Sequence, residues 1–241
     1  MLYRVKGQSL VVYKLRAETQ EYELHKAAGD CAVPVRGRVM LKAFDGEIIC
    51  MGFLMDLATP IIAPSGLAPP PAAVVPPSQR RDLMHEMVRL VQRLHESRRF
   101  VHGDLKLENM VLLDSDHDDD DQGRLRLCDF AEGRYVGEDE RVWAEASYSS
   151  TWHYESPGRL RRGEQMGMDP APPTIEDDLY GLGLSIWYFY TGRVLNGDLA
   201  GDDLGLKERQ REGGTIDVDE VDDPEAREIL RGLLRRRGAR I

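Results

Sequence analysis

The segment FVHGDLKLENMVLL carries several polar side chains at short intervals between apolar flanks. These side chains are His102, Asp104, Lys106 and Asn109. A further aspartate, Asp129, ends the apolar segment LRLCD later in the chain. A phosphoryl-transfer site needs one carboxylate to orient a hydroxyl group and a second carboxylate to hold magnesium. The order of these residues therefore indicates phosphoryl transfer, with Asp104 and Asp129 as the two carboxylates.

The other polar side chains of this region suit the same chemistry. Asn109 supplies a neutral oxygen to a hard cation, and Lys106 offers a positive charge to the transferred phosphoryl oxygens. Taken alone, each of these residues is more often a helix cap or a surface residue. Their order favours a catalytic loop over a chance turn.

A small strand-rich lobe with one helix is predicted before this segment. Residues 2–5 and 9–15 are rich in β-branched and aromatic side chains around a short glycine-containing turn, which is typical of a hairpin. A helix is predicted over 18–28. Two further strands, 35–43 and 48–54, are predicted around the turn that separates them.

A proline-rich connector is predicted between the two halves of the chain. Residues 60–77 contain seven of the thirteen prolines, which disfavours regular helix and central strand. A semi-rigid surface loop is the favoured interpretation, and a docking site for a proline-recognising partner is the alternative. Apolar residues then repeat at helical spacing over 83–94, which predicts a core-facing helix with Ser78 as its cap.

The remaining predicted elements frame the polar segment. Strands over 110–113 and 124–128 are expected to form a hairpin whose tip is the acidic run DSDHDDDD. This run lacks the glycine and glutamate of a calcium-binding loop, so a solvated tip is expected. Residues 177–190 are apolar on nearly every side and follow a capping pattern over 174–177, which predicts a central helix. The hydroxyl-rich residues 147–150 are expected to be an exposed loop.

Composition excludes several classes of protein. The chain has 241 residues, 41% of them hydrophobic, which is typical of a globular protein with a buried core. A net charge of −10 argues against nucleic-acid binding. Cys31, Cys50 and Cys128 are widely spaced, which favours reduced thiols over disulfides or a zinc site. Reduced thiols make an intracellular, cytoplasmic location the expectation, with the nucleus left open. Neither a signal peptide nor a membrane span is predicted.

The motifs HGD, LCDFAE and DDLYGLGLSIW together resemble the eukaryotic protein kinase family, particularly small kinase-like proteins of fungi. The resemblance covers nearly the whole chain. It implies an α+β, two-lobed kinase-like fold. The implied regions are a reduced N-lobe over 1–57, a hinge or linker over 58–77 and a helical C-lobe over 78–241. It also implies ATP and Mg²⁺ as cofactors and a serine or threonine of a protein as the acceptor.

The resemblance assigns roles to the residues of the C-terminal lobe. Asp104 inherits the role of catalytic base, and Asn109 and Asp129 inherit the magnesium sites. Lys106 matches the lysine of kinases that act on serine and threonine. Thr151, in TWHYESPG, matches the floor on which a substrate peptide lies, and it is expected to contact Asp104 and Lys106. In the same way Asp178 matches the buried aspartate that braces the catalytic loop. The resemblance also implies that His102 packs against the loop and supports it, and does not act as a general base.

In the N-terminal lobe the resemblance implies a nucleotide-binding lysine. Lys14, in VVYKLR, lies where the family has the strand lysine that holds the α- and β-phosphates. Glu21 is its expected ion-pair partner, because Leu24 and Ala28 then fall at apolar positions of the helix. Only thirteen residues precede Lys14 and they include one glycine, Gly7, so the glycine-rich loop that covers the phosphates is expected to be missing.

Other positions also depart from the family pattern. Gly103 replaces the arginine that usually precedes the catalytic aspartate, which removes the group that receives a phosphorylated activation segment. Ala131 replaces the glycine of the DFG motif and leaves Asp129 in place. Gly158 replaces a glutamate, so the usual ion pair with a late arginine, here Arg240, is expected to be absent.

Three functions remain open from the sequence. The first is a serine/threonine protein kinase. The second is a pseudokinase that binds or scaffolds, favoured by the missing glycine loop. The third is a small-molecule phosphotransferase, because HGD loops also resemble those of aminoglycoside and choline kinases. Lys106 and the TWHYESPG floor favour a protein acceptor over a small molecule.

Overall fold

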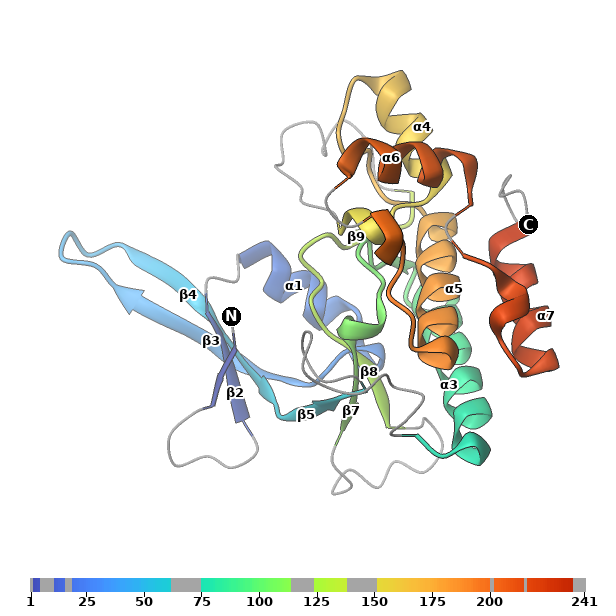
Figure 1. Cartoon of the computed structure of the whole chain (residues 1–241). Coiled ribbons are helices and arrows are strands. Elements are labelled where there is room, and N and C mark those ends of the chain that lie inside the picture. The colour runs from blue at the N-terminus through green and yellow to red at the C-terminus, as the bar shows by residue number, and fades with distance from the viewer. Residues whose placement is uncertain are drawn as a thin grey trace.

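The computed structural model describes residues 2–4, 11–15, 19–61, 75–113, 124–137, 151–199, 202–214 and 216–235. Strands dominate the N-terminal part and helices dominate the C-terminal part (Figure 1). The two parts meet at the helix α1 and at the short strands that carry the polar segment. Within the described ranges, each helix is too short or too polar to span a bilayer.

Four strands form the N-terminal sheet. They are β1 Leu2–Arg4, β2 Val11–Leu15, β3 Val35–Lys42 and β4 Ile48–Asp56. Their order in the sheet is β1-β2-β4-β3, and every neighbouring pair is antiparallel. The register places Leu2 opposite Lys14 and Lys14 opposite Phe53. Both predicted hairpins are therefore confirmed.

The helix α1, Thr19–Ala27, lies against this sheet and confirms the predicted helix. Its Leu24 and the following Ala28 are buried, as the apolar register required. Gly29 ends the turn with a φ of +59°, a conformation that glycine adopts without strain. Side chains of α1 contact β4, where His25 lies edge-on to Phe53 with ring centroids 5.4 Å apart. The sheet thus holds α1 in place through ring contacts.

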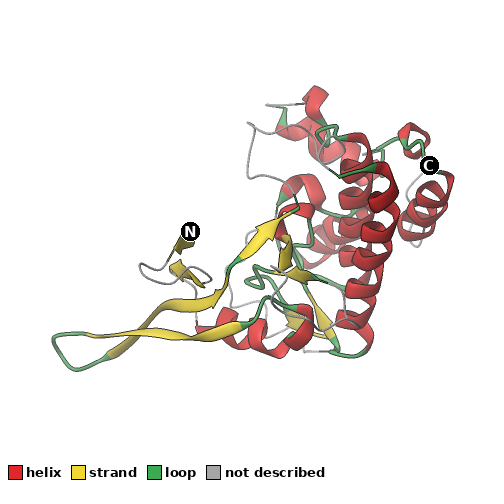
Figure 2. Ribbon diagram, turned by 90° about the horizontal axis from the view of Figure 1, so that it is seen from below, coloured by secondary structure: helices red, strands yellow, loops and turns green. Residues whose placement is uncertain are grey.

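The hairpin of β3 and β4 projects away from the body of the molecule in both views (Figures 1 and 2). Its distal half carries large apolar side chains that are well exposed. They are Met40 at 48%, Leu41 at 51%, Phe44 at 115%, Ile48 at 65% and Ile49 at 41% exposed. The sequence pattern predicted these strands, but it did not indicate that their apolar side chains would be exposed.

The predicted connector begins inside a second sheet. The strand β5, Ala58–Pro60, pairs with β7, Met110–Leu113, which pairs in turn with β8, Leu125–Leu127. Pro60 is tolerated because β5 is the edge strand of the order β5-β7-β8, where a missing N–H group costs no ladder bond. Residues 62–74 lie outside the described residues.

The long helix α3, Pro77–Glu96, confirms the predicted core-facing helix. Met84, Met87, Leu90, Val91 and Leu94 are buried along one face. The prediction that Ser78 caps this helix is wrong. Pro77 is the first helical residue, Pro76 precedes it, and no side chain caps the end. A proline at this position needs no cap for its nitrogen and presets the helical φ.

The central helix α5, Ile175–Thr191, is buried along most of its length and confirms the predicted capping box of Thr174 and Asp177. Two glycines let other chain segments approach it closely. A Cβ atom at Gly181 would lie 2.4 Å from the Leu105 carbonyl oxygen, and one at Gly183 would lie 2.9 Å from Leu234. These glycines therefore allow close packing around the helix.

The remaining elements complete the helical part. The helices are α4 Pro157–Met166, α6 Asp203–Glu212 and α7 Pro224–Arg235. The strand β6, Phe100–Val101, pairs with β9, Arg134–Tyr135. Short 3₁₀ turns occupy Gly29–Cys31, Leu107–Asn109, Trp152–Tyr154, Gly197–Leu199 and Val218–Glu220. The sequence reasoning did not predict α4, α6 or α7.

Candidate active site

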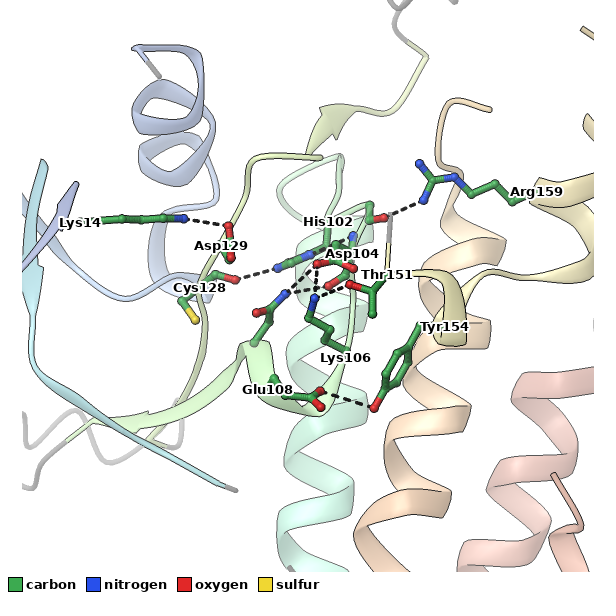
Figure 3. Close-up of polar contacts among 12 residues, drawn as sticks. Lys14, His102, Asp104, Lys106, Glu108, Cys128, Asp129, Thr151, Tyr154 and Arg159 are labelled. Carbon is green, nitrogen blue, oxygen red and sulfur yellow. Dashed lines mark hydrogen bonds and ion pairs between the residues drawn. The ribbon is translucent and has the colours of Figure 1, made fainter. Parts of the chain in front are cut away.

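The polar segment forms a loop between β6 and β7 (Figure 3). The Lys106 Nζ atom donates a hydrogen bond to Asp104 Oδ2 at 2.6 Å. The Asn109 side-chain amide donates to the Asp104 carbonyl oxygen at 2.8 Å. The 3₁₀ turn Leu107–Asn109 brings Asn109 back toward the aspartate. Lys106 and Asn109 therefore both bind Asp104, the first at its carboxylate and the second at its main-chain carbonyl.

Thr151 approaches this loop from the distant 3₁₀ turn that precedes α4. Its hydroxyl oxygen accepts a hydrogen bond from Lys106 Nζ. The predicted contact with Lys106 is thus present, and Thr151 reaches Asp104 through that ammonium group. A cavity of about 180 Å³ opens beside Thr151. Its walls are Glu108, Thr151, His153, Tyr154, Tyr188, Val194 and Leu195.

Asp178 braces the loop from α5, as predicted. Its carboxylate accepts hydrogen bonds from the backbone N–H groups of His102 and Gly103, at 2.7 Å and 2.9 Å. His95 Nε2 lies 2.8 Å from the same carboxylate. Burial works against the charge, yet His95 and the loop donors hold the pKa of Asp178 below its usual value. The carboxylate is therefore charged and fixes the backbone that leads into Asp104.

His102 packs inside the loop, in agreement with its predicted supporting role. Its ring lies 4.7 Å from the Phe130 ring, and its Nε2 atom lies 3.1 Å from the Cys128 carbonyl oxygen. Phe130 also meets His25 of α1, with ring centroids 5.1 Å apart. Together with the contact of His25 and Phe53, these rings form a continuous column from the sheet to the loop.

Gly103 occupies a position that excludes any side chain. Its φ is +83°, and a Cβ atom there would lie 2.1 Å from the Glu132 carbonyl oxygen. Arg159 holds the carbonyl of the same residue, because its Nη1 atom donates to Gly103 O at 2.9 Å. Its Nε atom donates to Ala171 O at 2.7 Å. Sequence reasoning missed Arg159, and its position next to Gly158 was the only indication available.

Lys14 forms an ion pair with Glu21, as predicted, and a second ion pair with Asp129, which the sequence reasoning did not predict. Its Nζ atom contacts the Glu21 carboxylate and lies 2.7 Å from Asp129 Oδ1. Burial alone would lower the pKa of Lys14, but Asp129 and Glu21 raise it above its usual value. Burial also opposes the charge on Asp129, yet Lys14 keeps the pKa of this carboxyl below its usual range. For Glu21, burial outweighs Lys14 and raises the pKa.

A different ion pair lies beside Gly158. Arg162 pairs with Asp177, whose carboxylate also accepts hydrogen bonds from Ser156 and Thr174. A Cβ atom at Gly158 would lie 4.0 Å from Asp177 Oδ1, so this network occupies the neighbourhood of the missing glutamate.

Several sequence features lie outside the described residues. They are Gly7, the acidic run 114–121, the hydroxyl-rich residues 147–150 and Arg240. The predictions made for these features stay predictions, and that includes the absence of an ion pair with Arg240.

Comparison with known proteins defines the class. A model of the protein kinase domain matches residues 57–238, which is most of the chain, so the chain belongs to the protein kinase domain family. The structure is also similar to that of the Cydia pomonella granulovirus kinase PK-1. The TM-score is 0.61 and the identity 16%, over 97% of this chain and 81% of that chain. At this identity the likeness shows the fold alone. A comparison with curated proteins gave no match.

These comparisons confirm the predicted two-lobed kinase fold and support kinase-type phosphoryl transfer in general. The likeness to small fungal proteins and the reduction of the N-lobe stay predictions.

Proposed function

We propose that this chain is a serine/threonine protein kinase that transfers the γ-phosphoryl group of ATP to a protein hydroxyl. The observation that carries the proposal is the placement of Lys106 Nζ, which contacts both Asp104 and Thr151. One ammonium group thereby ties the proposed base to the proposed substrate floor. A hydroxyl group lying on this floor is within reach of Asp104, which would orient it and accept its proton.

The chemistry of Lys14, Asn109 and Asp129 fits a nucleotide and magnesium. The Asn109 amide nitrogen is used by Asp104, which leaves its oxygen for a cation. Asp129 is 47% exposed, and one of its oxygens is used by Lys14. In the part of the chain that the structure describes, no three acidic, histidine or cysteine side chains cluster as a metal site. Magnesium in kinases needs few protein ligands because the nucleotide phosphates supply the others.

The proposal assigns one role to each residue around the nucleotide. Lys14, oriented by Glu21, would hold the nucleotide phosphates. Asn109 and Asp129 would hold magnesium, which neutralises charge on the transferred group when bound. Lys106 stabilises the negative charge that spreads over the phosphoryl oxygens.

The same proposal retains the regions expected from sequence. The N-lobe is 1–57, the connector 58–77 and the C-lobe 78–241. The connector is proposed as a semi-rigid link, and a proline-recognising partner as its less favoured role. The acceptor is proposed to be a serine or threonine in a protein of the cytoplasm.

One observation favours a pseudokinase as the second candidate. Lys14 Nζ lies 2.7 Å from Asp129, so the lysine proposed for the phosphates is engaged by the aspartate proposed for magnesium. A chain that kept this ion pair would bind nucleotide weakly and would act as a scaffold. The contact of Lys106 with Thr151 favours a protein acceptor over an aminoglycoside or choline.

The test compares the parent protein with Asp104→Asn and Asp129→Asn. Magnesium-dependent ATP binding is measured by calorimetry, and transfer is measured with serine and threonine peptides, an aminoglycoside and choline. We expect Asp104→Asn to bind ATP but to lose transfer by about 100-fold or more, since it removes the group that handles the proton. Asp129→Asn should weaken magnesium-dependent binding.

The matched control is Asp219→Asn, an exposed carboxylate on the far helical part that should leave both measurements unchanged. A parent protein without binding or transfer above background would refute the kinase proposal and favour the scaffold. Transfer to a small molecule but to no peptide would refute the protein acceptor.

A further inference from the structure

The β3–β4 hairpin projects away from the body of the molecule (Figure 2), and its distal half carries large apolar side chains that are exposed. Five of its large apolar side chains, from Met40 to Ile49, are between 41% and 115% exposed. At about 200 Å² for a fully exposed large side chain, they present roughly 600 Å². Each partner in a standard interface contributes about 800 Å². The hairpin therefore exposes most of the surface that a small interface requires.

The outer edge of β3 is open on the same hairpin. β3 is the last strand in the sheet order, and no described strand pairs with its outer side. The Ala43 N–H group donates to the Glu47 carbonyl at 2.8 Å. Bonded and non-bonded residue pairs alternate in an antiparallel ladder, so the backbone groups of Leu41 face β4. Those of Met40 and Lys42 therefore point to the open edge.

We propose that this edge binds the same edge of a second copy of the chain, antiparallel and about a two-fold axis centred on Leu41. In such a pair the backbone groups of Met40 and Lys42 face those of Lys42 and Met40 of the second copy. Leu41 lies opposite its own counterpart in a non-bonded pair, where side chains approach most closely.

The cations of β3 select this register. Like charges placed directly opposite each other destabilise a strand pair. An axis at Arg38 or at Lys42 would put each of these residues opposite itself. An axis at Val39 would oppose Arg36 and Lys42, and an axis at Met40 would oppose Arg38 and Lys42. Among the possible axes from Arg38 to Lys42, only the axis at Leu41 gives a register in which no cation lies opposite another cation.

The same register covers the most exposed residue of the hairpin. β3 ends at Lys42 and Phe44 follows in the turn, so with the axis at Leu41 the turn that carries Phe44 in one copy comes beside Arg38 of the other. Arg38 already lies over the Tyr22 ring at 4.8 Å and pairs with Glu23 at 3.3 Å. A second ring beside this guanidinium adds a cation–π contact and buries the ring. The tip of each hairpin thus packs against the part of the other hairpin that lies near Arg38.

The charges at the tip favour a protein over a lipid surface as the occupant. Lys42 is followed by Asp45 and Glu47, so the tip carries no basic cluster of the kind that binds anionic lipid. We expect a dimer that dissociates in the micromolar range, because the contact area is at the low end for stable pairs.

The first test is sedimentation over a range of protein concentrations. The parent should change from monomer to dimer, and Leu41→Lys should stay monomeric at concentrations where the parent is dimeric. The matched control is Leu204→Lys, an apolar residue of α6 that is 79% exposed and lies away from the hairpin. It should dimerise as the parent does. A parent that stays monomeric throughout, or equal loss in both variants, would overturn the proposal.

The second test fixes the register by mild oxidation of cysteine variants in a Cys50→Ser background. Leu41→Cys should form a disulfide-linked dimer, because paired Cα atoms about 4.5 to 5.5 Å apart satisfy disulfide geometry. Ile49→Cys lies on the same face one strand further from the axis, about 14 Å from its counterpart, and should not cross-link. Cross-linking of Ile49→Cys and not of Leu41→Cys would show face packing and refute the edge pairing.

Discussion

Replacing Asp178 by asparagine tests whether the buried carboxylate holds the catalytic loop. Asp178 is 2% exposed and accepts from two backbone N–H groups and from His95. Asparagine has the same shape but offers one acceptor oxygen and one donor group. If its oxygen faces His102 and His95, its amide confronts the Gly103 N–H group. One buried backbone donor then has no acceptor.

The variant is expected to be less stable because it loses the buried charge and leaves one backbone N–H group without an acceptor. Removing one member of a buried, charged hydrogen-bonded set costs about 3 to 5 kcal/mol. For a chain of this length each kcal/mol lowers the melting temperature by about 2 to 4 °C. We therefore expect Asp178→Asn to lower the melting temperature by about 10 °C and to lose transfer, because Gly103 leads directly into Asp104.

The assay is thermal unfolding of the parent and the variant, monitored by circular dichroism. Asp219→Asn is the matched control, because its carboxylate is 71% exposed and pairs with Arg231 at 2.7 Å. Surface pairs of this kind contribute about 1 kcal/mol or less. A melting temperature of Asp178→Asn within about 2 °C of the control would refute the reasoning.

Three further substitutions or conditions have defined outcomes. Thr151→Val removes the hydroxyl that accepts from Lys106 and should slow transfer about tenfold to a hundredfold, whereas Thr151→Ser should restore it in a peptide phosphorylation assay. Gly103→Ala places a methyl group against the Glu132 carbonyl, so reduced unfolding stability in urea is expected, and an unchanged midpoint would contradict it. Burial lowers the pKa of His25 to about 4. The folded protein then binds a proton at His25 more weakly than the unfolded chain does. The free energy of unfolding that is present above pH 6.5 should therefore fall by about 3 kcal/mol as the pH decreases to 4 and below. Urea unfolding across this pH range should show the loss, and His25→Phe should lessen it.

Features encoded by neighbouring residues could be predicted from the sequence. The capping box of Thr174 and Asp177 depends on two side chains three positions apart, and the structure contains it. The pairing of Lys14 with Glu21 followed from the resemblance to protein kinases together with the apolar register of one helix, whose Leu24 is buried as expected. The prediction of a Ser78 cap also rested on neighbouring residues, and it was wrong because Pro77 is the first residue of the helix.

Contacts between distant segments could not be predicted from local pattern. Arg159 binds the carbonyl of Gly103 across 56 positions, and its place next to Gly158 does not indicate which distant residue it contacts. The helix α7 is different, since Ala226, Leu230 and Leu234 recur at helical spacing and could have been recognised. The exposure of the β3–β4 hairpin depends on whether other parts of the fold cover it. The pattern of residues within the two strands carries no information about that.

The crowding at Gly103 restricts how this chain can change over evolutionary time. A single substitution to arginine would drive a Cβ atom into the Glu132 carbonyl, 2.1 Å away, in a left-handed conformation. An arginine, which the family usually has at this position, therefore cannot be accommodated by this one substitution, because the backbone at Glu132 would have to move. A lineage with this packing is expected to reach an arginine only through a compensating change in the segment after Asp129. The packing at Glu132 thus constrains which residues can follow His102 in this loop.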